Sequence, residues 1–413
     1  MTRPLGAVSP ELALVRALDF LESHADVVGT RITSGTPPPF LDARGWGRYL
    51  DALSPAGLEH AEADPAWFFE AAPDAPPSLK AFARDAHELT RLDRLDPGEG
   101  HEPVRGRLVK RRKSEQIAAL LALVGRLGGV ARRLVDVGSG MGHLSRIASE
   151  RLERDAVGID WNERLLGAAM ELAIGTRATF RVADALEGPL QFEPGDLVLG
   201  LHACGEVTDV ALVAAAEAGA PVAFVSCCLQ KVRAGRREGL SRAAAERGFV
   251  LSREVLGLSN LLGRSKGIEV AQATSLEARE ARHALRLLLE SRGIVTQPGE
   301  EMRGVNRRRA RHGFAQLAHE VFATRGLLAP TTAEVIRFGE KAHVEFARMR
   351  RWGLPRTLVA RLVECAVAFD RAAFLRERGY RVRVVEAFPV DTSPRNVAVV
   401  GAPPFAQLTG TSW

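Results

Sequence analysis

The sequence predicts an α/β fold built on a doubly wound, mostly parallel sheet, and three observations lead to it. First, a short apolar run ending at Val137 passes through three alternating glycines into a helical pattern. Second, short apolar runs and helical runs alternate through residues 134–226, as in sheets joined by right-handed crossovers. Third, the apolar runs 380–388 and 396–401 are too close together for a parallel crossover, which predicts an antiparallel hairpin completing the sheet.

The turn after the first strand carries Gly138, Gly140 and Gly142. Glycine lets the backbone bend tightly and approach a ligand without a Cβ in the way, and the following helix directs free N–H groups into the turn. Dinucleotide enzymes favour G-x-G-x-x-G, with a pyrophosphate at the helix N-terminus. Here Asp136 precedes the first glycine, and the form D-x-G-x-G-x-G resembles the first motif of class I S-adenosylmethionine (SAM) methyltransferases. A carboxylate suits the cationic amino-acid end of SAM better than an anionic pyrophosphate.

Polar residues follow the later strands. The strand 156–160 ends in Asp160, about twenty residues beyond the glycines, where an acid holds the ribose hydroxyls of a nucleoside. Trp161 is expected to flank the adenine, and an exposed cap residue is the alternative. Asp184, after the strand 178–182, is expected to accept from the adenine amino group, and an N-cap role is the alternative. Ligands of such sheets lie at the carboxyl ends of the strands. With the strand ends at 201 and 226, one crevice is expected to gather Asp136, Asp160, Asp184, His202, Cys204, Cys227 and Cys228.

The chain is expected to form three parts. Residues 1–105 form an N-terminal helical accessory region, residues 106–254 and 361–403 form the discontinuous core, and residues 255–360 form an inserted helical lobe. The last helix of the core is expected from Leu362 to Gly379.

A basic run, Lys110–Lys113, leads into an amphipathic helix that is expected to begin after a Ser114 cap. Because this helix precedes the glycine-turn strand, Lys113 and Gln116 are expected to contact the site, and Gln116 is assigned to the cofactor. A solvated charged face is the alternative for Lys110 and Arg111.

Composition places the protein among soluble, cytoplasmic chains. Hydrophobic residues make up 46% of the sequence and charged residues 26%, which is ordinary for a globular protein. No apolar run approaches the ~20 residues that span a membrane, and no signal segment is evident. Four cysteines in 413 residues do not make a disulfide framework.

A net charge of +6 is compatible with a nucleic-acid partner, although arginine is frequent throughout the chain. The segment Met302–His312 holds five arginines. These side chains are expected to follow an RNA phosphate backbone, and a solvated helix start is the alternative.

Several motifs together resemble one methyltransferase-like family, the one that includes the ribosomal RNA adenine dimethylase domain-containing protein. They are Asp136–Arg146, Gly200–Gly205, Ser226–Cys228, Leu258–Asn260, Ser393–Asn396 and the helix Pro77–Leu92. The resemblance implies a Rossmann-like SAM-binding fold with a C-terminal antiparallel hairpin, and it implies methyl transfer.

The resemblance leaves the acceptor open. The strand-end cysteines are also similar to those of the family that 2′-O-methylates tRNA acceptor stems, but Leu229–Lys231 stand where that family has histidines. Enzymes that methylate N6 of adenine carry Asn/Asp-Pro-Pro-aromatic after strand four, whereas this chain has Leu201–Cys204.

The strand-end groups allow several kinds of chemistry. His202 is expected to remove a proton from an acceptor, or to be bonded only to backbone. Three interpretations stay open for the thiols of Cys204, Cys227 and Cys228: buried packing, a zinc site with His202, or a thiolate that attacks a pyrimidine ring. The catalytic assignment is His202, Cys204 and Cys228, with no metal ligand.

The sequence therefore predicts a SAM-dependent methyltransferase acting on a macromolecule, with RNA (tRNA or rRNA) favoured as the acceptor. A protein methyltransferase is the first alternative. A non-catalytic SAM-binding module that docks RNA or protein is the second.

Overall fold

The structure is a computed structural model that describes residues 9–94, 108–125, 127, 131–262 and 269–404. The described chain forms two compact units. The sheet unit comprises the described residues of 1–29, 85–263 and 359–413, and the helical unit those of 30–84 and 264–358.

This grouping differs from the division expected from the sequence. Helices α1 (Pro10–Ser23) and α2 (Ala25–Gly29) belong to the sheet unit and not to a separate N-terminal region. The expected boundary at residue 105 and the linker near residue 96 lie outside the described residues.

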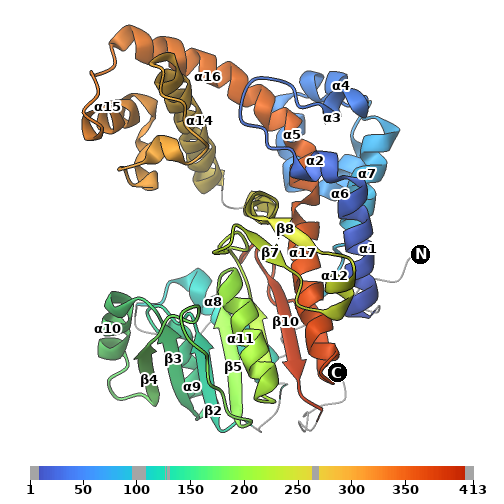
Figure 1. Ribbon diagram of the computed structural model, residues 1–413, viewed down its shortest axis with the longest axis vertical. Helices are drawn as coiled ribbons and strands as arrows, with labels where there is room; N and C mark the ends of the chain where they lie inside the picture. Colours follow the sequence, from blue (N-terminus) through green and yellow to red (C-terminus); the bar gives the residue numbers. More distant parts are fainter. Residues whose placement is uncertain (1–8, 95–107, 126, 128–130, 263–268, 405–413) are drawn as a thin grey trace. The chain divides into compact units, whose positions relative to one another are not determined.

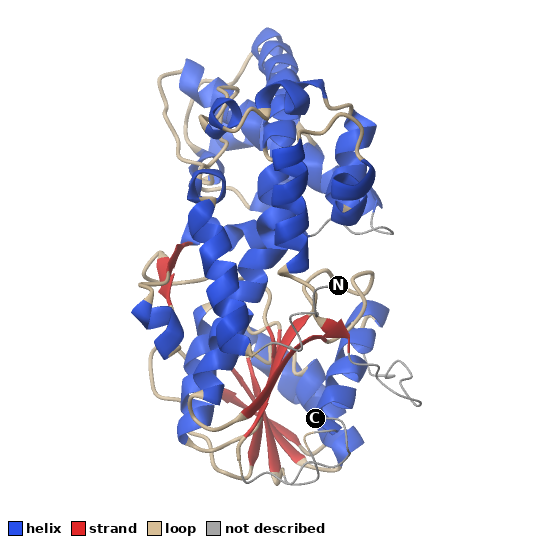
Figure 2. Cartoon of the chain, turned by 90° about the vertical axis from the view of Figure 1, so that its right-hand side faces the viewer, coloured by secondary structure: helices blue, strands red, loops and turns tan. Residues whose placement is uncertain are grey.

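The sheet unit is built on an eight-stranded sheet of order β1-β9-β10-β6-β5-β2-β3-β4. Strands β2 to β6 pair in parallel, and β10 runs antiparallel to both of its neighbours. Figure 2 shows helices on both faces of this sheet. The expected doubly wound sheet with a C-terminal antiparallel hairpin is confirmed. The strands are β1 (Asp93–Arg94), β2 (Arg133–Val137), β3 (Asp155–Asp160), β4 (Ala178–Val182), β5 (Asp196–Leu201), β6 (Val222–Val225), β9 (Arg381–Glu386) and β10 (Val397–Ala402).

The central strands β5 and β6 are buried along their whole length, as expected for apolar runs covered on both faces. Two features were not predicted from the sequence. Strand β1 adds two residues to the edge beside β9, and β7 (Arg236–Glu238) pairs with β8 (Val250–Ser252) as a separate hairpin.

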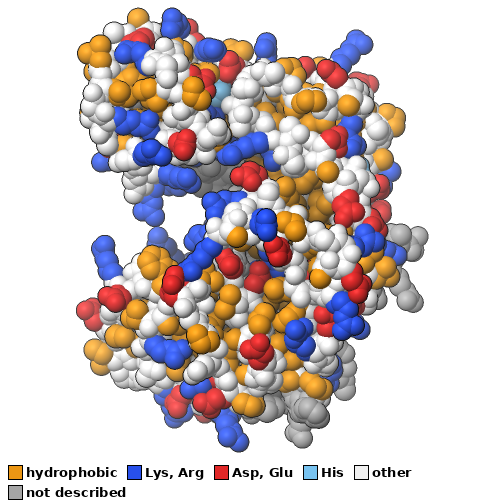
Figure 3. All heavy atoms as spheres, in the orientation of Figure 1, with side chains coloured by type: hydrophobic (Ala, Val, Ile, Leu, Met, Phe, Trp, Pro, Cys, Tyr) orange, Lys and Arg blue, Asp and Glu red, His pale blue; other side chains and the backbone are white. Residues whose placement is uncertain are grey.

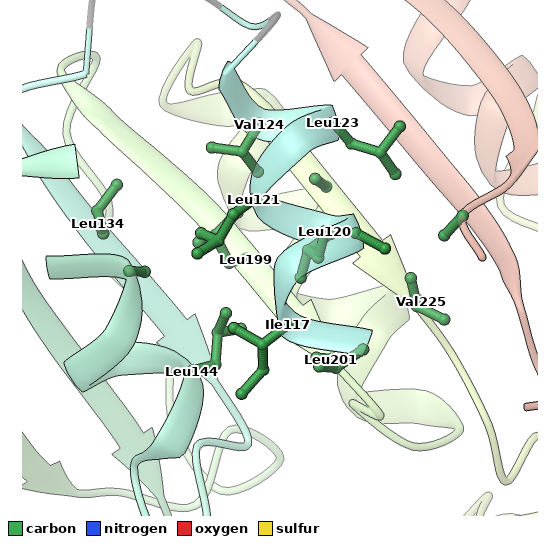
Figure 4. Close-up of a cluster of buried hydrophobic side chains, with 14 of the residues drawn as sticks. Ile117, Leu120, Leu121, Leu123, Val124, Leu134, Leu144, Leu199, Leu201 and Val225 are labelled. Atoms are coloured by element: carbon green, nitrogen blue, oxygen red, sulfur yellow. The ribbon is translucent and has the colours of Figure 1, made fainter. Parts of the chain in front are cut away.

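Helix α8 (Arg111–Gly125) packs on the sheet through Ile117, Leu120, Leu121 and Val124, as Figure 4 shows. The remaining helices of this unit cross between strands or close its end. They are α9 (His143–Leu152), α10 (Glu163–Leu172), α11 (Glu206–Glu217), α12 (Arg242–Glu246), α13 (Arg253–Leu256), η2 (Gly257–Leu262) and most of α17 (Leu354–Arg376).

The expected start of α8 was wrong. Ser114 is not its cap, because its own N–H already donates to the Lys110 carbonyl at 3.0 Å, four residues back. The basic run therefore forms the first helical turn, and Ser114 is buried. Ile117 and the apolar residues after it hold the helix on the sheet, and extending a formed helix by one turn is favourable enough to outweigh the capping preference of serine.

The expected start of α17 was also wrong, since the helix begins at Leu354 and not at Leu362. Pro355 lies in its first turn, where a missing N–H costs no helical hydrogen bond. The first residues of α17 belong to the helical unit and the rest to the sheet unit.

The helical unit contains α-helices and short 3₁₀ segments, and it comprises the described residues of 264–358 in the expected inserted lobe together with residues 30–84 of the expected N-terminal region. Figure 1 shows α14, α15 and α16 beside one another, and Leu285, Leu288, Phe322 and Phe338 fill their core. Its elements are α3 (Phe40–Ala43), α4 (Gly47–Ala52), α5 (Pro55–Ala63), α6 (Pro65–Ala71), most of α7 (Pro77–Glu88), α14 (Glu269–Ser291), η3 (Glu300–Met302), η4 (Arg307–His312), α15 (Phe314–Thr324) and α16 (Thr332–Trp352).

Candidate active site

A cavity of about 460 Å³ opens at the carboxyl ends of β2, β3, β4 and β5 in the sheet unit. Its size is that of pockets that hold small ligands. Six residues expected at the site from the sequence line it together: Gly138, Asp160, Trp161, Asp184, His202 and Cys204. The convergence of strand ends that the sequence predicted is therefore present for these side chains.

Asp160 fixes the glycine turn. One carboxylate oxygen accepts the Gly140 N–H at 2.9 Å, and the other accepts the Asn162 N–H at 2.9 Å. Both bonds orient the carboxylate at the end of β3, where it lines the cavity. A charged acceptor held by two backbone donors is preorganised to bind a further donor from a ligand.

The other glycines support the turn from behind. Gly142 has a φ of 66°, and a Cβ on it would lie 2.3 Å from the Phe180 ring. Gly142 is thus required by the left-handed backbone and by packing on β4. Neither Gly140 nor Gly142 is among the lining residues of the cavity.

Asp136 lies beneath the turn instead of in the cavity. It is 3% exposed, and the Ser145 hydroxyl donates to its Oδ2 at 2.7 Å. The pKa of Asp136 is raised to about 6. Burial is the main cause, and the Asp160 charge also raises the pKa, whereas the Ser145 hydrogen bond and the Lys113 charge lower it. The direct contact with the amino-acid end of SAM expected for Asp136 therefore has no support in the lining of this cavity.

This buried carboxylate predicts a pH-dependent stability. The folded-state pKa lies above the ordinary value of 3.8, so the folded protein holds this proton more tightly than the unfolded chain. The Asp136 contribution to stability is then present in full below pH ~3.8 and falls as pH rises through ~6. Asp136→Asn keeps the acceptor for Ser145 but loses the attraction to Lys113, so we expect it to be about 1–2 kcal/mol more stable than wild type at pH 8.

Chemical denaturation of both proteins at pH 4 and pH 8 measures this difference. The gain should largely disappear at pH 4, where the wild-type carboxyl is protonated in the folded state and partly protonated in the unfolded chain. If Asp136→Asn is less stable than wild type at pH 8, the buried Asp136 carboxylate does not destabilise the folded protein, and this interpretation is wrong.

Trp161 and Asp184 flank the cavity in different ways. Trp161 is 69% exposed, so its ring is open to solvent on one side. Asp184 Oδ1 accepts the Leu186 N–H at 2.9 Å, and its Oδ2 accepts from Arg233 at 3.1 Å. Asp184 therefore closes a turn, and no helix begins there for it to cap.

His202 is held in a fixed orientation at the end of β5. Its φ of 72° is uncommon for a residue with a side chain, and its N–H donates to the Val225 carbonyl at 2.8 Å. The ring Nε2 lies 2.9 Å from Gln116 Oε1. Burial, and then the charges of Lys113, Arg112 and Arg395, lower the pKa of His202 to about 4. The ring is therefore neutral at pH 7 and donates Nε2–H to Gln116, which is buried behind the cavity.

Cys204, Cys227 and Cys228 form a compact group, which we call the thiol cluster. Cys204 Sγ lies 2.9 Å from Cys227 Sγ, and Cys227 Sγ lies 3.6 Å from Cys228 Sγ. Hydrogen bonds from Cys204 and Cys227, together with the Arg395 charge, outweigh burial and lower the pKa of Cys228. A hydrogen bond to Cys204 and burial raise the pKa of Cys227. Negative charge in the cluster therefore resides first on Cys228.

Two further residues complete the cluster, and the sequence did not assign a role to either. Arg395 donates to the Cys227 carbonyl at 3.2 Å and lies 3.5 Å from Cys228 Sγ. Its other nitrogen donates to Asn260 Oδ1 at 2.8 Å. The segments 258–260 and 393–396 stood out in the sequence only as family motifs, and the structure shows that they meet beside the thiols.

A buried group of ion pairs holds the loop after β5 and the loop after β6 in place. Asp209 lies 2.8 Å from Arg237 and 2.7 Å from Arg371. Arg371 also donates to the Ser226 hydroxyl at 2.8 Å and to the Gly205 carbonyl at 3.0 Å. The loop after β5 and the loop after β6 are thus tied to one guanidinium.

A second cavity of about 580 Å³ lies beside α11 and β7. Of the charged residues that line it, Asp209 and Arg237 pair with each other, and the Glu206 carboxylate accepts the Arg233 N–H at 2.8 Å. Asp209 and Arg237 thus neutralise each other, and no described residue at the carboxyl ends of β2 to β6 lines this cavity.

Residues 112–235 match a family model described as a methyltransferase domain. The chain contains a methyltransferase domain. The matched residues cover less than half of the chain, and they include the glycine turn, Asp160, Asp184, His202 and the thiol cluster. The cavity therefore lies within the methyltransferase domain.

Solved structures of methyltransferases resemble parts of this chain. One is a magnesium protoporphyrin IX methyltransferase from Synechocystis PCC 6803 with bound SAH, at 18% identity and a TM-score of 0.23, covering 30% of this chain and 62% of that one. Another is a putative RNA methyltransferase from Pyrococcus horikoshii, at 16% identity and a TM-score of 0.24, covering 36% and 72%. A third is a plantazolicin methyltransferase in complex with SAH, at 16% identity and a TM-score of 0.22, covering 49% and 67%.

The aligned part spans less than two thirds of the first of these chains. Similarity this low does not identify the methyl acceptor of the present protein. S-adenosylmethionine, the cofactor expected from the sequence, is consistent with the match to a methyltransferase domain. The description of the family model is general. Membership of the methyltransferase-like family that the sequence motifs resemble therefore stays a prediction. No helix of the described residues is both long and apolar enough to span a membrane.

Proposed function

We propose that this protein is a SAM-dependent methyltransferase whose acceptor is RNA. The observation that carries the methyltransferase assignment is the cavity at the strand ends, where Gly138, Asp160 and Asp184 lie within the matched domain. A cationic sulfonium nucleoside is attracted by these carboxylates, of which Asp184 is also paired with Arg233 at 3.1 Å.

The residues of the cavity fit this cofactor. Asp160 would hold the ribose hydroxyls, Asp184 would accept from the adenine amino group and Trp161 would lie against the ring, while Gly138 allows close approach of the backbone. Asp136, Gly140, Gly142 and Gln116 would act from behind the cavity by holding the turn and the His202 ring. Bound SAM supplies an electrophilic methyl group on its sulfonium sulfur.

The protein must then place an acceptor atom in line with that methyl and exclude water. His202 and Cys204 line the cavity beyond the carboxylates, so we propose that they face the acceptor, with Cys228 behind them. His202 would contribute through its fixed ring, which Gln116 and the backbone bond to Val225 hold in place.

Exposed arginines of the helical unit support RNA as the acceptor. All five arginines of the expected cluster are exposed, and Arg303 and Arg309 face Glu300 and Glu320. Figure 3 shows Lys and Arg side chains gathered on this side of the helical unit, where Figure 1 places α15.

The other three, Arg307, Arg308 and Arg311, have no ion pair among the described residues. Free guanidinium groups of this kind suit phosphate contacts. We therefore propose that this arginine group binds the RNA backbone, and that the protein belongs with the methyltransferase-like family named above. A reducing, cytoplasmic location is part of the proposal, since all four cysteines are free thiols.

Transfer of tritiated methyl from SAM into total RNA and total protein tests the function. We expect label that resists protease and is released by ribonuclease. Label in protein alone would overturn the RNA acceptor but keep methyl transfer. Tight SAM binding without turnover on any extract would favour a non-catalytic module and overturn the enzyme.

Replacing Arg307, Arg308 and Arg311 together by alanine should weaken RNA binding regardless of sequence. Each lost phosphate contact lowers the slope of log K against log salt by about 0.7 for single strands, or about 2 in total. The matched control removes three exposed cations of α16, Arg337, Lys341 and Arg348. Filter binding of RNA at several salt concentrations measures both variants. If both triple variants have the same slope of log K against log salt, these arginines do not form the RNA-binding surface.

A further inference from the structure

We propose that Cys204, Cys227 and Cys228 bind a single zinc ion at the carboxyl ends of β5 and β6, beside the cavity. This site rests on the thiol cluster itself and holds for any methyl acceptor. It replaces the assignment of these residues as packing or as attacking thiolates.

The positions of the sulfur atoms support one shared ion. The three Sγ atoms lie within 4.8 Å of one another, and the shortest separation, 2.9 Å between Cys204 and Cys227, is well beyond the ~2.05 Å of a disulfide. Around tetrahedral zinc, with bonds of about 2.3 Å, sulfur ligands lie about 3.8 Å apart. Small rotations of the side chains therefore bring all three sulfurs to one ion.

The local backbone explains how adjacent cysteines reach one point. In a strand, Cys227 and Cys228 would face opposite sides. Strand β6 ends at Val225, however, and both residues lie in the irregular segment beyond it. The neighbouring glycine helps, because Gly205 has a φ of 58° and a Cβ on it would lie 2.1 Å from the Lys231 carbonyl. The two loops therefore approach closely enough to share a ligand.

The ligand set favours zinc. Thiolates select soft or borderline ions, of which zinc takes four ligands. No His, Asp or Glu of the described residues joins the three sulfurs, and the His202 Nε2 is bonded to Gln116, unlike the zinc interpretation made from the sequence. The fourth position is left for water or for an acceptor atom that enters from the cavity lined by Cys204.

The surroundings match the charge of such a site. Three thiolates and Zn²⁺ carry one net negative charge. The Arg395 guanidinium lies 3.5 Å from Cys228 Sγ and is braced by Asn260. Lys231 donates its backbone N–H to the Cys228 carbonyl at 3.1 Å and adds a second positive charge nearby. Outer contacts of this kind orient ligands and tune metal affinity.

Metal analysis of the full-length protein, purified with reductant and dialysed, tests the proposal. We expect about one zinc ion per chain. Cys228→Ser should lose most of it, whereas Cys365→Ser, which alters a buried thiol on α17 outside the cluster, should keep it. Arg395→Ala retains all three thiols and should bind zinc roughly 10- to 100-fold more weakly. Cobalt substitution should give the near-ultraviolet absorption of thiolate-to-cobalt charge transfer.

Several results would overturn the site. They are wild-type protein without zinc although its thiols are reduced, equal zinc in Cys228→Ser and Cys365→Ser, or a Cys204–Cys227 disulfide in the reduced preparation. If Cys228→Ser does not fold, the cobalt spectrum of the wild type decides, and absence of the charge-transfer band overturns the proposal. Methyl transfer is not used as a readout, so these outcomes are independent of the proposed function.

Discussion

Replacing Arg371 by leucine is expected to lower the free energy of unfolding by about 3–5 kcal/mol, the usual cost of removing one partner of a buried ion pair. Burial raises the pKa of Asp209, but the charges of Arg237 and Arg371 outweigh it and hold that pKa below its ordinary value. Without Arg371, the Asp209 carboxylate keeps only one cation, and the hydrogen bonds that Arg371 donates to the Gly205 carbonyl and to the Ser226 hydroxyl are lost.

Arg376→Leu is the matched control on the same helix. Arg376 pairs with Glu11 at 3.2 Å, but its side chain is 45% exposed, and exposed pairs contribute about 0–1 kcal/mol. Denaturant unfolding of the full-length variants, followed by circular dichroism, compares the two. Similar losses for both variants would show that the buried ionic group does not brace the two loops.

Replacing Asp160 by alanine is expected to weaken SAM binding by about 2–3 kcal/mol, or roughly 30- to 150-fold in Kd. The change removes the proposed acceptor of the ribose hydroxyls. It also leaves the Gly140 N–H and the Asn162 N–H without the carboxylate that orders the turn. Both effects act on the same part of the cavity. We therefore expect the loss of binding free energy to fall in the upper part of the range that is usual for hydrogen bonds to charged groups.

Asp155→Ala provides the control, because Asp155 is exposed at the opposite end of the same strand, β3. Isothermal titration of each variant with SAM gives the affinities, and thermal unfolding confirms that both are folded. We expect Asp155→Ala to bind as the wild type does. If Asp160→Ala binds SAM with unchanged affinity, the proposed position of the nucleoside at this end of β3 is wrong.

Strands β2 to β6, β9 and β10 were predicted from the sequence to within about two residues at each end, whereas β1, β7 and β8 were not predicted. The bounds of β4 and β5 agree with those expected, because short apolar runs bordered by glycine, proline and acids are distinctive. Helix starts were less certain, as Ser114 and Leu362 show. Tertiary packing decides whether a first turn forms, and a local capping preference of about 1 kcal/mol is easily overridden.

The site was predictable only where a residue follows its own strand. Asp160, Asp184, His202 and Cys204 lie at strand ends, and parallel topology alone brings them together. Arg371 and Arg395 reach the same loops from segments more than a hundred residues further along the chain, and hydrogen bonds at such separation leave no periodic signal. Asp136 shows the opposite case, in which a motif position lies under the turn and not in the cavity.

The reversed direction of β10 has a consequence during synthesis. Because this strand runs antiparallel to β6, its beginning lies at the edge where the parallel strands end, and Arg395, just before it, contacts the thiol cluster there. A ribosome makes residues 264–358, the second segment of the helical unit, before it makes this arginine. The three thiols are therefore made well before the guanidinium that lies 3.5 Å from Cys228 Sγ in the folded protein, so the complete thiol cluster forms only after the last strands have joined the sheet.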